Sequence, residues 1–177
     1  MKTILTTVLV MLITTTGFAS IQFGQATYGG SGCPAGSIGP ENLIVSDEGY
    51  VSLEGVFDIF AENGMDRRFC QIAIPMSIET DSRLVAEFAF IDGFVENPGS
   101  KLNLNFDVWT VGSERASIEA DLSQQDGEFL LHSEKTVLRE CGENPDTILR
   151  MNASVFAKNA SASIHRMAVV IKTESCP

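Results

Sequence analysis

Apolar and polar side chains alternate with a period of two through most of this 177-residue chain. The run from Leu102 to Val108 sets Leu, Leu, Phe and Val against Asn103, Asn105 and Asp107. The same alternation covers residues 51–59, 70–78, 84–90, 118–122, 149–155 and 165–171. Successive side chains of a strand point to opposite faces, so the pattern predicts antiparallel strands with one buried and one solvated face.

Turn-forming residues separate these runs. Gly, Pro, Asn and Asp gather at 47–49, 62–64, 97–99, 126–127 and 142–145, and residues 159–162 are expected to form a hairpin turn between the last two strands. No helical stripe of four turns is visible. We therefore expect an all-β fold, namely a single antiparallel β-sandwich or jelly-roll-like domain.

The first 19 residues have the features of a secretory signal peptide. Lys2 precedes an apolar run over 4–13, and Gly17-Phe18-Ala19 provides small residues for cleavage after Ala19. A run of this length is too short to cross a bilayer core of roughly 30 Å, and no later segment reaches 18 apolar residues. We expect no transmembrane segment, and a single domain over 20–177 that is exported to the extracellular space or a periplasm.

Four cysteines remain after this leader: Cys33, Cys70, Cys141 and Cys176. An even number in an exported chain predicts two disulfides, and four cysteines allow three pairings. Pairing Cys33 with Cys70 and Cys141 with Cys176 would close two loops of similar length, each stabilising the fold by roughly 3–4 kcal/mol. That pairing would also hold both ends of the mature chain. A structural zinc site is not expected, because the sequence has no Cys-x-x-Cys pair.

Charge restricts the partners. The net charge is −11, and cleavage after Ala19 removes Lys2, leaving 11 − 23 = −12. Nucleic acids and anionic membranes bind basic surfaces, so neither is expected as a partner. The sequence suggests no cofactor and no metal.

The segment from Tyr28 to Ser37, which reads Tyr-Gly-Gly-Ser-Gly-Cys-Pro-Ala-Gly-Ser, is the most distinctive part of the sequence. It resembles the opening motif of a secreted family known as domain of unknown function 4360. Further similarities are the cysteine after Arg67-Arg68-Phe69, the Cys141-Gly142 pair and the C-terminal cysteine. The residues before that last cysteine, Thr173-Glu174-Ser175, depart from the aromatic and basic residues common in the family. The resemblance implies a secreted, disulfide-linked β domain and no particular activity.

One predicted strand carries a candidate ligand-binding face. Its polar side consists of Asn103, Asn105, Asp107 and Trp109. An indole can stack on the C–H face of a sugar while amides and a carboxylate bond its hydroxyls. The alternative is that Trp109 folds over the end of the sheet and the asparagines are simply solvated.

Other chemistries are weaker in the sequence. Asp107 with Glu119 or Asp121 is the best carboxylate pair for glycoside hydrolysis, and either His132 or His165 is a conceivable general base. Acidic turns at 79–81 and 121–126 are loose candidates for calcium. The glycines of 30–36 resemble a phosphate-binding loop, but no helix pattern follows them. Asn152 and Asn159 begin N-glycosylation sequons.

We therefore expect an exported, non-enzymatic module that binds a surface ligand, with a glycan as the candidate ligand. The alternatives are a secreted hydrolase using acidic residues and a structural surface protein without a ligand.

Overall fold

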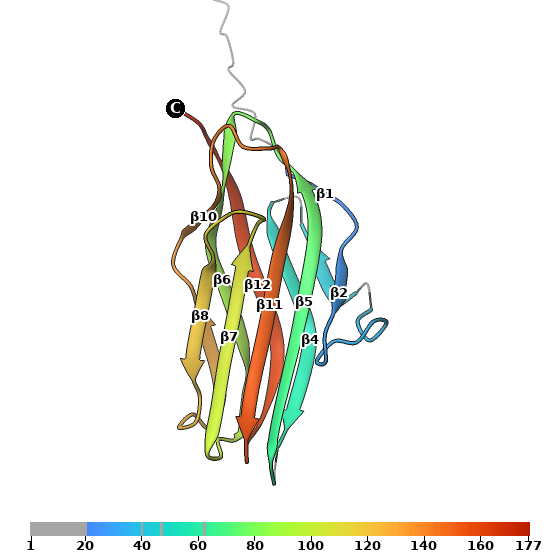
Figure 1. Ribbon diagram of the computed structural model, residues 1–177, viewed down its shortest axis with the longest axis vertical. Helices are drawn as coiled ribbons and strands as arrows, with labels where there is room; N and C mark the ends of the chain where they lie inside the picture. The colour runs from blue at the N-terminus through green and yellow to red at the C-terminus, as the bar shows by residue number, and fades with distance from the viewer. Residues whose placement is uncertain (1–20, 40, 47, 62) are drawn as a thin grey trace, which may run out of the picture.

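Two antiparallel sheets pack face to face as a sandwich (Figure 1) in the computed structural model, which describes residues 21–39, 41–46, 48–61 and 63–177. The expected leader lies outside these residues, as do Asp47 and Glu62 of two predicted turns. Within the described ranges, no helix has the length and apolarity needed to cross a membrane. The prediction of an all-β antiparallel sandwich with two disulfides is confirmed.

Sheet A forms the layer nearer the viewer in Figure 1. Its order is β1 (Gln22–Phe23), β5 (Met65–Ser77), β11 (Asp146–Lys158), β7 (Lys101–Trp109) and β8 (Ala116–Asp121), with β2 (Thr27–Gly29) also paired to β5. Sheet B has the order β10 (Thr136–Arg139), β6 (Ser82–Asn97), β12 (Ser161–Ser175), β4 (Tyr50–Phe60) and β3 (Leu43–Val45), with β9 (Gly127–His132) also paired to β6. A short turn, in which Asn159 adopts φ 50°, connects β11 to β12 and so links the centres of the two sheets. The prediction of a hairpin there was wrong, because β11 and β12 belong to different sheets and do not pair.

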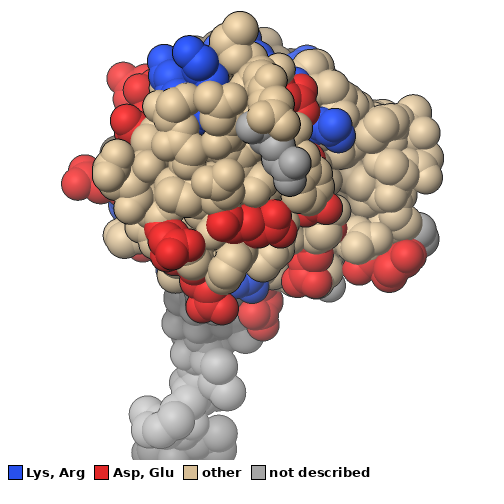
Figure 2. Space-filling view, turned by 90° about the horizontal axis from the view of Figure 1, so that it is seen from below, with Lys and Arg blue, Asp and Glu red and all other residues tan. Residues whose placement is uncertain are grey.

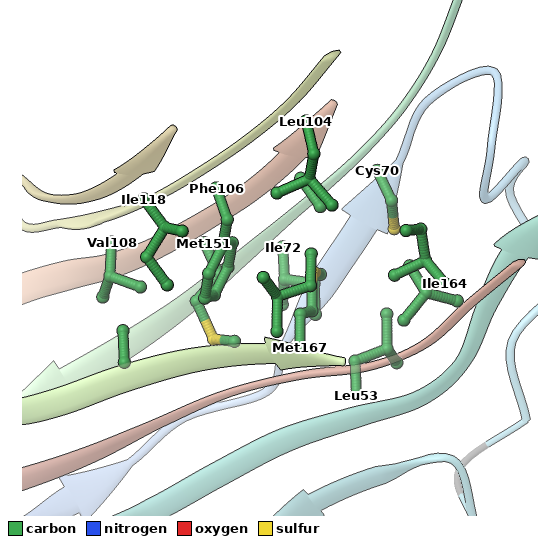
Figure 3. Packing of buried hydrophobic residues seen from close by; sticks show 14 of the residues in the cluster. Leu53, Cys70, Ile72, Leu104, Phe106, Val108, Ile118, Met151, Ile164 and Met167 are labelled. Atoms are coloured by element: carbon green, nitrogen blue, oxygen red, sulfur yellow. The ribbon is translucent and has the colours of Figure 1, made fainter. Parts of the chain in front are cut away.

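The predicted inward side chains fill the space between the sheets. Figure 3 shows Leu104, Phe106 and Met151 from sheet A meeting Leu53 and Met167 from sheet B. These side chains are at most 2% exposed. Burying one such side chain stabilises a fold by roughly 1.5–3 kcal/mol, so this layer holds the two sheets together.

Two register shifts change the predicted faces of β6 and β12. The β6 ladder has an extra residue at Glu87, between Phe88, which pairs with Val170, and Ala86, which pairs with Ile171. Phe88 and Phe90 therefore leave the core face, and the prediction that grouped them with Leu84 and Ala86 was wrong. A bulge adds one residue to one strand and so reverses which face the following side chains occupy.

The second shift falls at His165. The prediction that grouped His165 with Met167 and Val169 was also wrong, because the pairing of β12 shifts between Ile164 and Arg166. Ile164 is 2% exposed and enters the core, whereas His165 is exposed. His132, at the end of β9, is exposed as well.

The glycine-rich N-terminal segment is attached to β5. Cys33 and Cys70 form a disulfide, and the Gly32 amide donates to the Phe69 carbonyl over 2.9 Å. Gly30 has φ 147°, and a Cβ atom there would lie 2.2 Å from the same carbonyl oxygen. Only glycine fits this close approach, so the segment packs against the strand rather than forming a phosphate-binding loop.

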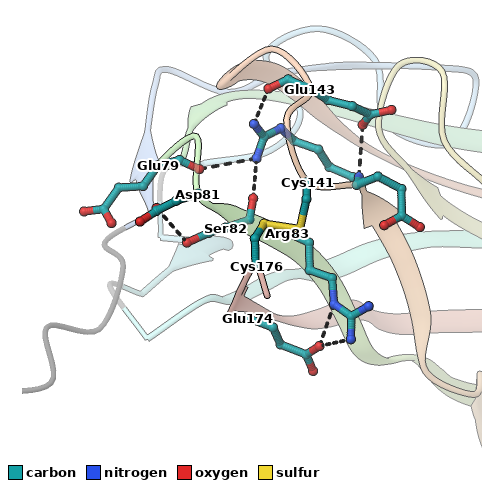
Figure 4. The surroundings of a disulfide bond; sticks show 10 residues. Glu79, Asp81, Ser82, Arg83, Cys141, Glu143, Glu174 and Cys176 are labelled. Carbon is teal, nitrogen blue, oxygen red and sulfur yellow. Dashed lines mark hydrogen bonds and ion pairs between the residues drawn. A yellow bond between two sulfur atoms is a disulfide. The ribbon is translucent and has the colours of Figure 1, made fainter.

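The C-terminal end is held by the Cys141–Cys176 disulfide (Figure 4). Beside it, the Arg139 side chain is buried, with 3% of its surface exposed. Its guanidinium donates to the backbone carbonyls of Ser82 (2.8 Å) and Asn144 (2.9 Å), and also to that of Glu143. One buried cation thus links the start of β6 to the loop that carries Cys141.

We predict that Arg139→Met lowers the free energy of unfolding by about 2–4 kcal/mol, because buried carbonyls left without a donor cost roughly 1–3 kcal/mol each. Urea unfolding monitored by circular dichroism measures this change. Arg83→Met is the matched control, since Arg83 is 41% exposed in its ion pair with Glu174 and should contribute about 1 kcal/mol or less. Equal losses in the two variants would contradict the proposed clamp.

The carboxylate of Glu174 predicts an acid-dependent part of the stability. Lys135 and Arg83 donate hydrogen bonds to it and hold its pKa below the ordinary value. A lowered folded-state pKa stabilises the fold above the unfolded-state pKa, and this stabilisation is lost as the pH falls through the folded-state pKa.

Glu174→Gln should therefore lower the melting temperature slightly at pH 7, by the equivalent of about 1 kcal/mol or less. The difference from the unmodified chain should shrink as the pH falls through the lowered pKa of Glu174, which thermal melts from neutral to acidic pH will measure. Glu128→Gln removes an exposed carboxyl with no ion pair among the described residues and serves as the control. A Glu174→Gln deficit that persists undiminished at low pH would refute the linkage.

Candidate functional site

The outer face of sheet A brings polar side chains from four strands together. In the register, Asn103 lies between Phe156 of β11 and Asp121 of β8. The next row of the same face places Asn105 between Ser154 and Glu119. These residues are far apart in sequence, and the strand pairing alone makes them neighbours.

A hollow of about 690 Å³ lies over these two rows. Its walls are mostly amides, hydroxyls and charged groups: Arg67, Lys101, Asn103, Leu104, Asn105, Glu119, Ala120, Asp121, Ser154 and Phe156. Asn103 is exposed and Asn105 is half-buried. The Asn105 Oδ1 atom is buried and accepts no hydrogen bond from any described residue.

Phe156 is the aromatic residue of this hollow. Its side chain is partly exposed, and the Lys101 Nζ atom lies 5.5 Å from the centre of its ring. An ammonium at this distance is attracted by the ring and can hold it in place. The hollow therefore combines an apolar ring with hydrogen-bonding groups on several sides.

The two carboxylates of the hollow come from the edge strand β8. Asp121 accepts hydrogen bonds from the hydroxyl and the backbone amide of Ser123, and these bonds, with the nearby charge of Lys101, lower its pKa. Asp121 is therefore an ionised acceptor at neutral pH. Glu119 is exposed two residues earlier on the same face of the strand.

Asp107 and Trp109 lie on the same side of β7 but outside the hollow lining. Asp107 is 7% exposed, and its two oxygens accept from Ser117 (2.6 Å) and Asn105 (3.3 Å). The Arg115 guanidinium lies 4.7 Å from the centre of the Trp109 ring and 3.8 Å from an Asp107 oxygen. Of the predicted face, the structure brings Asn103 and Asn105 into the hollow and leaves Asp107 and Trp109 beside it.

The carboxylates predicted as a hydrolytic pair, Asp107 with Glu119 or Asp121, do not all line the hollow. Glu119 and Asp121 line the hollow, whereas Asp107 pairs with Ser117 across the ladder and is already hydrogen-bonded. Asp107 is therefore poorly presented to a substrate.

A second hollow of about 370 Å³ lies on the same face, over β2, β5 and β11. Phe69, which is 42% exposed, and Arg150 are among its lining residues. Phe69 pairs directly with Ser154, which lines the first hollow. The two hollows are thus neighbours on one surface.

The distinctive glycine-rich segment borders this surface. Gly29 and Gly30 line the second hollow, and the Ser31 hydroxyl accepts from the Phe69 amide over 3.2 Å. The Cys33–Cys70 disulfide fixes the same stretch. The motif therefore helps to position Phe69.

The remaining sequence candidates do not assemble into a site. No group of three or more His, Cys, Asp or Glu side chains that could hold a metal ion occurs among the described residues, including the acidic turns considered for calcium. Of the two sequon asparagines, Asn159 is exposed in the β11–β12 turn, while Asn152 is half-buried in mid-strand.

Sequence reasoning missed Arg67, Lys101, Ser154 and Phe156 as part of the face. The available signal was the polar side of the 149–155 alternation, where Phe156 continues the phase of Asn152 and Ser154 as an aromatic residue. Phe156 lies beside Asn103 only because β11 pairs with β7, and the sequence does not show which strands pair.

The family model described as "Domain of unknown function (DUF4360)" matches residues 19–174. No curated protein matches the sequence at a significant level.

Three solved structures show distant similarity. TmCBM61 in complex with β-1,4-galactotriose is 8% identical with a TM-score of 0.38, covering 85% of this chain and 88% of that chain. TmCBM27, a carbohydrate-binding module studied for mannan recognition, is 9% identical with a TM-score of 0.34, covering 86% and 98%. A family two carbohydrate esterase from Cellvibrio japonicus is 10% identical with a TM-score of 0.24, covering 88% and 36%. Likeness at this level carries no argument about the function of this chain.

Proposed function

We propose a function for this chain, which belongs to the DUF4360 family (domain of unknown function): it is an exported module that binds a glycan on the outer face of sheet A. The observation that carries the proposal is the 690 Å³ hollow in which the Phe156 ring lies among amides, a hydroxyl and two carboxylates.

A sugar ring has an apolar C–H face and a rim of hydroxyl groups. A partly exposed aromatic ring suits the first, and convergent donors and acceptors suit the second. Asn103 supplies both a donor and an acceptor, and Asp121 is an ionised acceptor. A ligand hydroxyl that reached Asn105 would also provide the donor that its buried Oδ1 lacks.

This proposal modifies the face expected from the sequence. Asn103 and Asn105 keep their proposed role, while Phe156 replaces Trp109 as the stacking ring because Arg115 covers the indole. Asp107 becomes a support that orients Asn105 through the 3.3 Å hydrogen bond. The hydrolase alternative is less favoured, since Asp107 is buried and already hydrogen-bonded.

Export is part of the proposal. Two disulfides hold the ends of the described chain, and disulfides persist mainly in oxidising compartments. The proposed leader over residues 1–19 would carry the chain to such a compartment.

We predict that Phe156→Ala weakens glycan binding about tenfold or more, because losing a ring contact costs about 0.5–1.5 kcal/mol in addition to the lost burial. Isothermal titration against oligosaccharides selected from a glycan array measures the change. Phe88→Ala is the matched control, since Phe88 is 39% exposed on the outer face of sheet B and should leave affinity unchanged. Melting curves confirm that both variants fold.

Two results would refute this glycan site. One is the absence of binding to any glycan of a broad array by the folded protein. The other is binding that Phe156→Ala and Asn103→Ala leave intact.

For export, we expect protein recovered outside the cytosol of an expressing cell to begin at Ser20 and to have no free thiol before reduction. N-terminal sequencing and alkylation followed by mass spectrometry test both points. Mature protein that keeps residues 1–19, or that carries reduced cysteines, would contradict the prediction.

A further inference from the structure

The Lys and Arg side chains of the described chain divide into three groups. Six form an ion pair with a carboxylate: Arg68, Arg83, Arg115, Lys135, Arg166 and Lys172. A seventh, Arg139, is bound by backbone carbonyls. The four others have no carboxylate oxygen within 4.0 Å among the described residues: Arg67, Lys101, Arg150 and Lys158.

These four cations, which have no ion pair within the described part of the chain, lie on the outer face of sheet A. Arg67 and Lys101 line the first hollow, and Arg150 lines the second. Lys158 pairs with Lys101 across the β11–β7 ladder, which sets two like charges directly opposite each other. Such a pair is unfavourable in a sheet unless a counter-charge joins it. Asp121 supplies part of that charge, since the nearby Lys101 lowers its pKa.

This placement is unexpected for a chain with a net charge of −11, in which acidic partners are abundant. The cations of sheet B use such partners: Arg166 pairs with Asp92 at 2.7 Å and Lys172 with Glu87 at 3.1 Å. In the end view of Figure 2, most basic side chains lie in the upper half and most acidic ones lie at the left and in the lower half, although the two kinds are adjacent in places. The charge of the protein is therefore unevenly distributed, with its unpaired cations on the proposed binding face.

The cations are too widely spaced for one small anion. Arg150 pairs with Ala73, six residues along β5 from Arg67, which corresponds to about 20 Å at 3.4 Å per residue. Across the sheet, the two hollows extend from β8 to β2, four strand spacings of roughly 4.8 Å, or about 19 Å. A ligand that contacts all of them is a chain with repeated negative groups.

Two carboxylates also line the surface, but they are confined to its β8 edge. Glu119 and Asp121 belong to that edge strand, whereas Arg67, Arg150 and Lys158 belong to β5 and β11. Hydroxyl groups of a ligand can donate to the carboxylates while its anionic groups lie over the cations. The arrangement suits a polymer that carries both hydroxyl groups and anionic groups.

We infer that the ligand of sheet A is an acidic polysaccharide, whose carboxylate or sulfate groups pair with Arg67, Lys101, Arg150 and Lys158 and whose sugar rings stack on Phe156 and Phe69. This inference rests on the proposed glycan-binding function and names the chemical class of the glycan. Across the β11–β5 ladder, Phe156 lies opposite Arg67 and Phe69 lies opposite Ser154. The two rings on adjacent strands therefore provide two platforms along one path.

The experiment compares charged polymers with neutral forms of the same chain. Polygalacturonate, alginate and hyaluronan, each beside its carboxyl-reduced form, are titrated into the folded full-length mature protein, with heparin as the sulfate probe and single-stranded DNA as a non-glycan polyanion. We expect at least one acidic polysaccharide to bind at least tenfold more tightly than its reduced form. Its affinity should fall several-fold between 50 and 500 mM salt, because screening weakens exposed charge pairs.

Variants then locate the contacts. Arg67→Gln and Arg150→Gln should each weaken binding of the acidic polymer at least fivefold and change binding of its reduced form little. Lys172→Gln is the control, because Lys172 is an exposed cation of sheet B that is paired with Glu87, and it should have no effect. Unchanged melting temperatures exclude unfolding as the cause of a loss.

The outcomes separate this inference from the proposed function. Equal affinity for acidic and reduced polymers would overturn the inference that the glycan is acidic, while the proposed glycan binding would stand. The same holds if Arg67→Gln weakens binding of the acidic polymer no more than Lys172→Gln does. If DNA binds as tightly as every acidic polysaccharide, the inference of an acidic polysaccharide is overturned as well, because the site would then recognise negative charge and not the sugar. Failure of all polysaccharides, neutral and acidic, would refute the glycan-binding function and this inference with it.

Discussion

The connection of β11 to β12, which crosses from one sheet to the other, is the element on which the rest of this fold depends. Each of the two strands lies at the centre of one sheet: β11 pairs with β5 and β7, and β12 pairs with β6 and β4. Their inward side chains, such as Met151 and Met167, meet in the middle of the core. The outward side of β11 consequently occupies the middle of the outer face of sheet A, which is where Ser154, Phe156 and Arg150 contribute to the two hollows.

The two disulfides restrain this body at different places. Cys33–Cys70 ties the glycine-rich segment to β5 beside Phe69, so a structural bond also shapes the rim of the proposed ligand surface. Cys141–Cys176 and the buried guanidinium of Arg139 hold the C-terminal strand and the loop before β11. These bonds therefore fix the position of β11 and also stabilise the fold, because β11 enters sheet A directly from the loop that Arg139 binds.

Electrostatics distinguishes the two outer faces. On sheet B the cations are neutralised by neighbouring carboxylates, and Arg166 lies both against Asp92 and 4.8 Å from the ring centre of Phe90. On sheet A the unpaired cations surround partly exposed phenyl rings and amides. A solvated cation contributes little to the stability of a fold, and the proposed acidic ligand would give these cations a partner.

The fold class and most of the long strands could be predicted from the sequence, because a period of two and turn residues are local properties. The even number of cysteines likewise predicted two disulfides. The sequence also indicated that Asn103 and Asn105 face solvent. The β-bulges near Glu87 and His165 were not visible in the alternation, and they turned Phe88, Phe90 and His165 outward. Only the tertiary structure decided that Phe156 and Arg67 join Asn103 while Arg115 covers Trp109, because strand order and register depend on packing between segments distant in the chain.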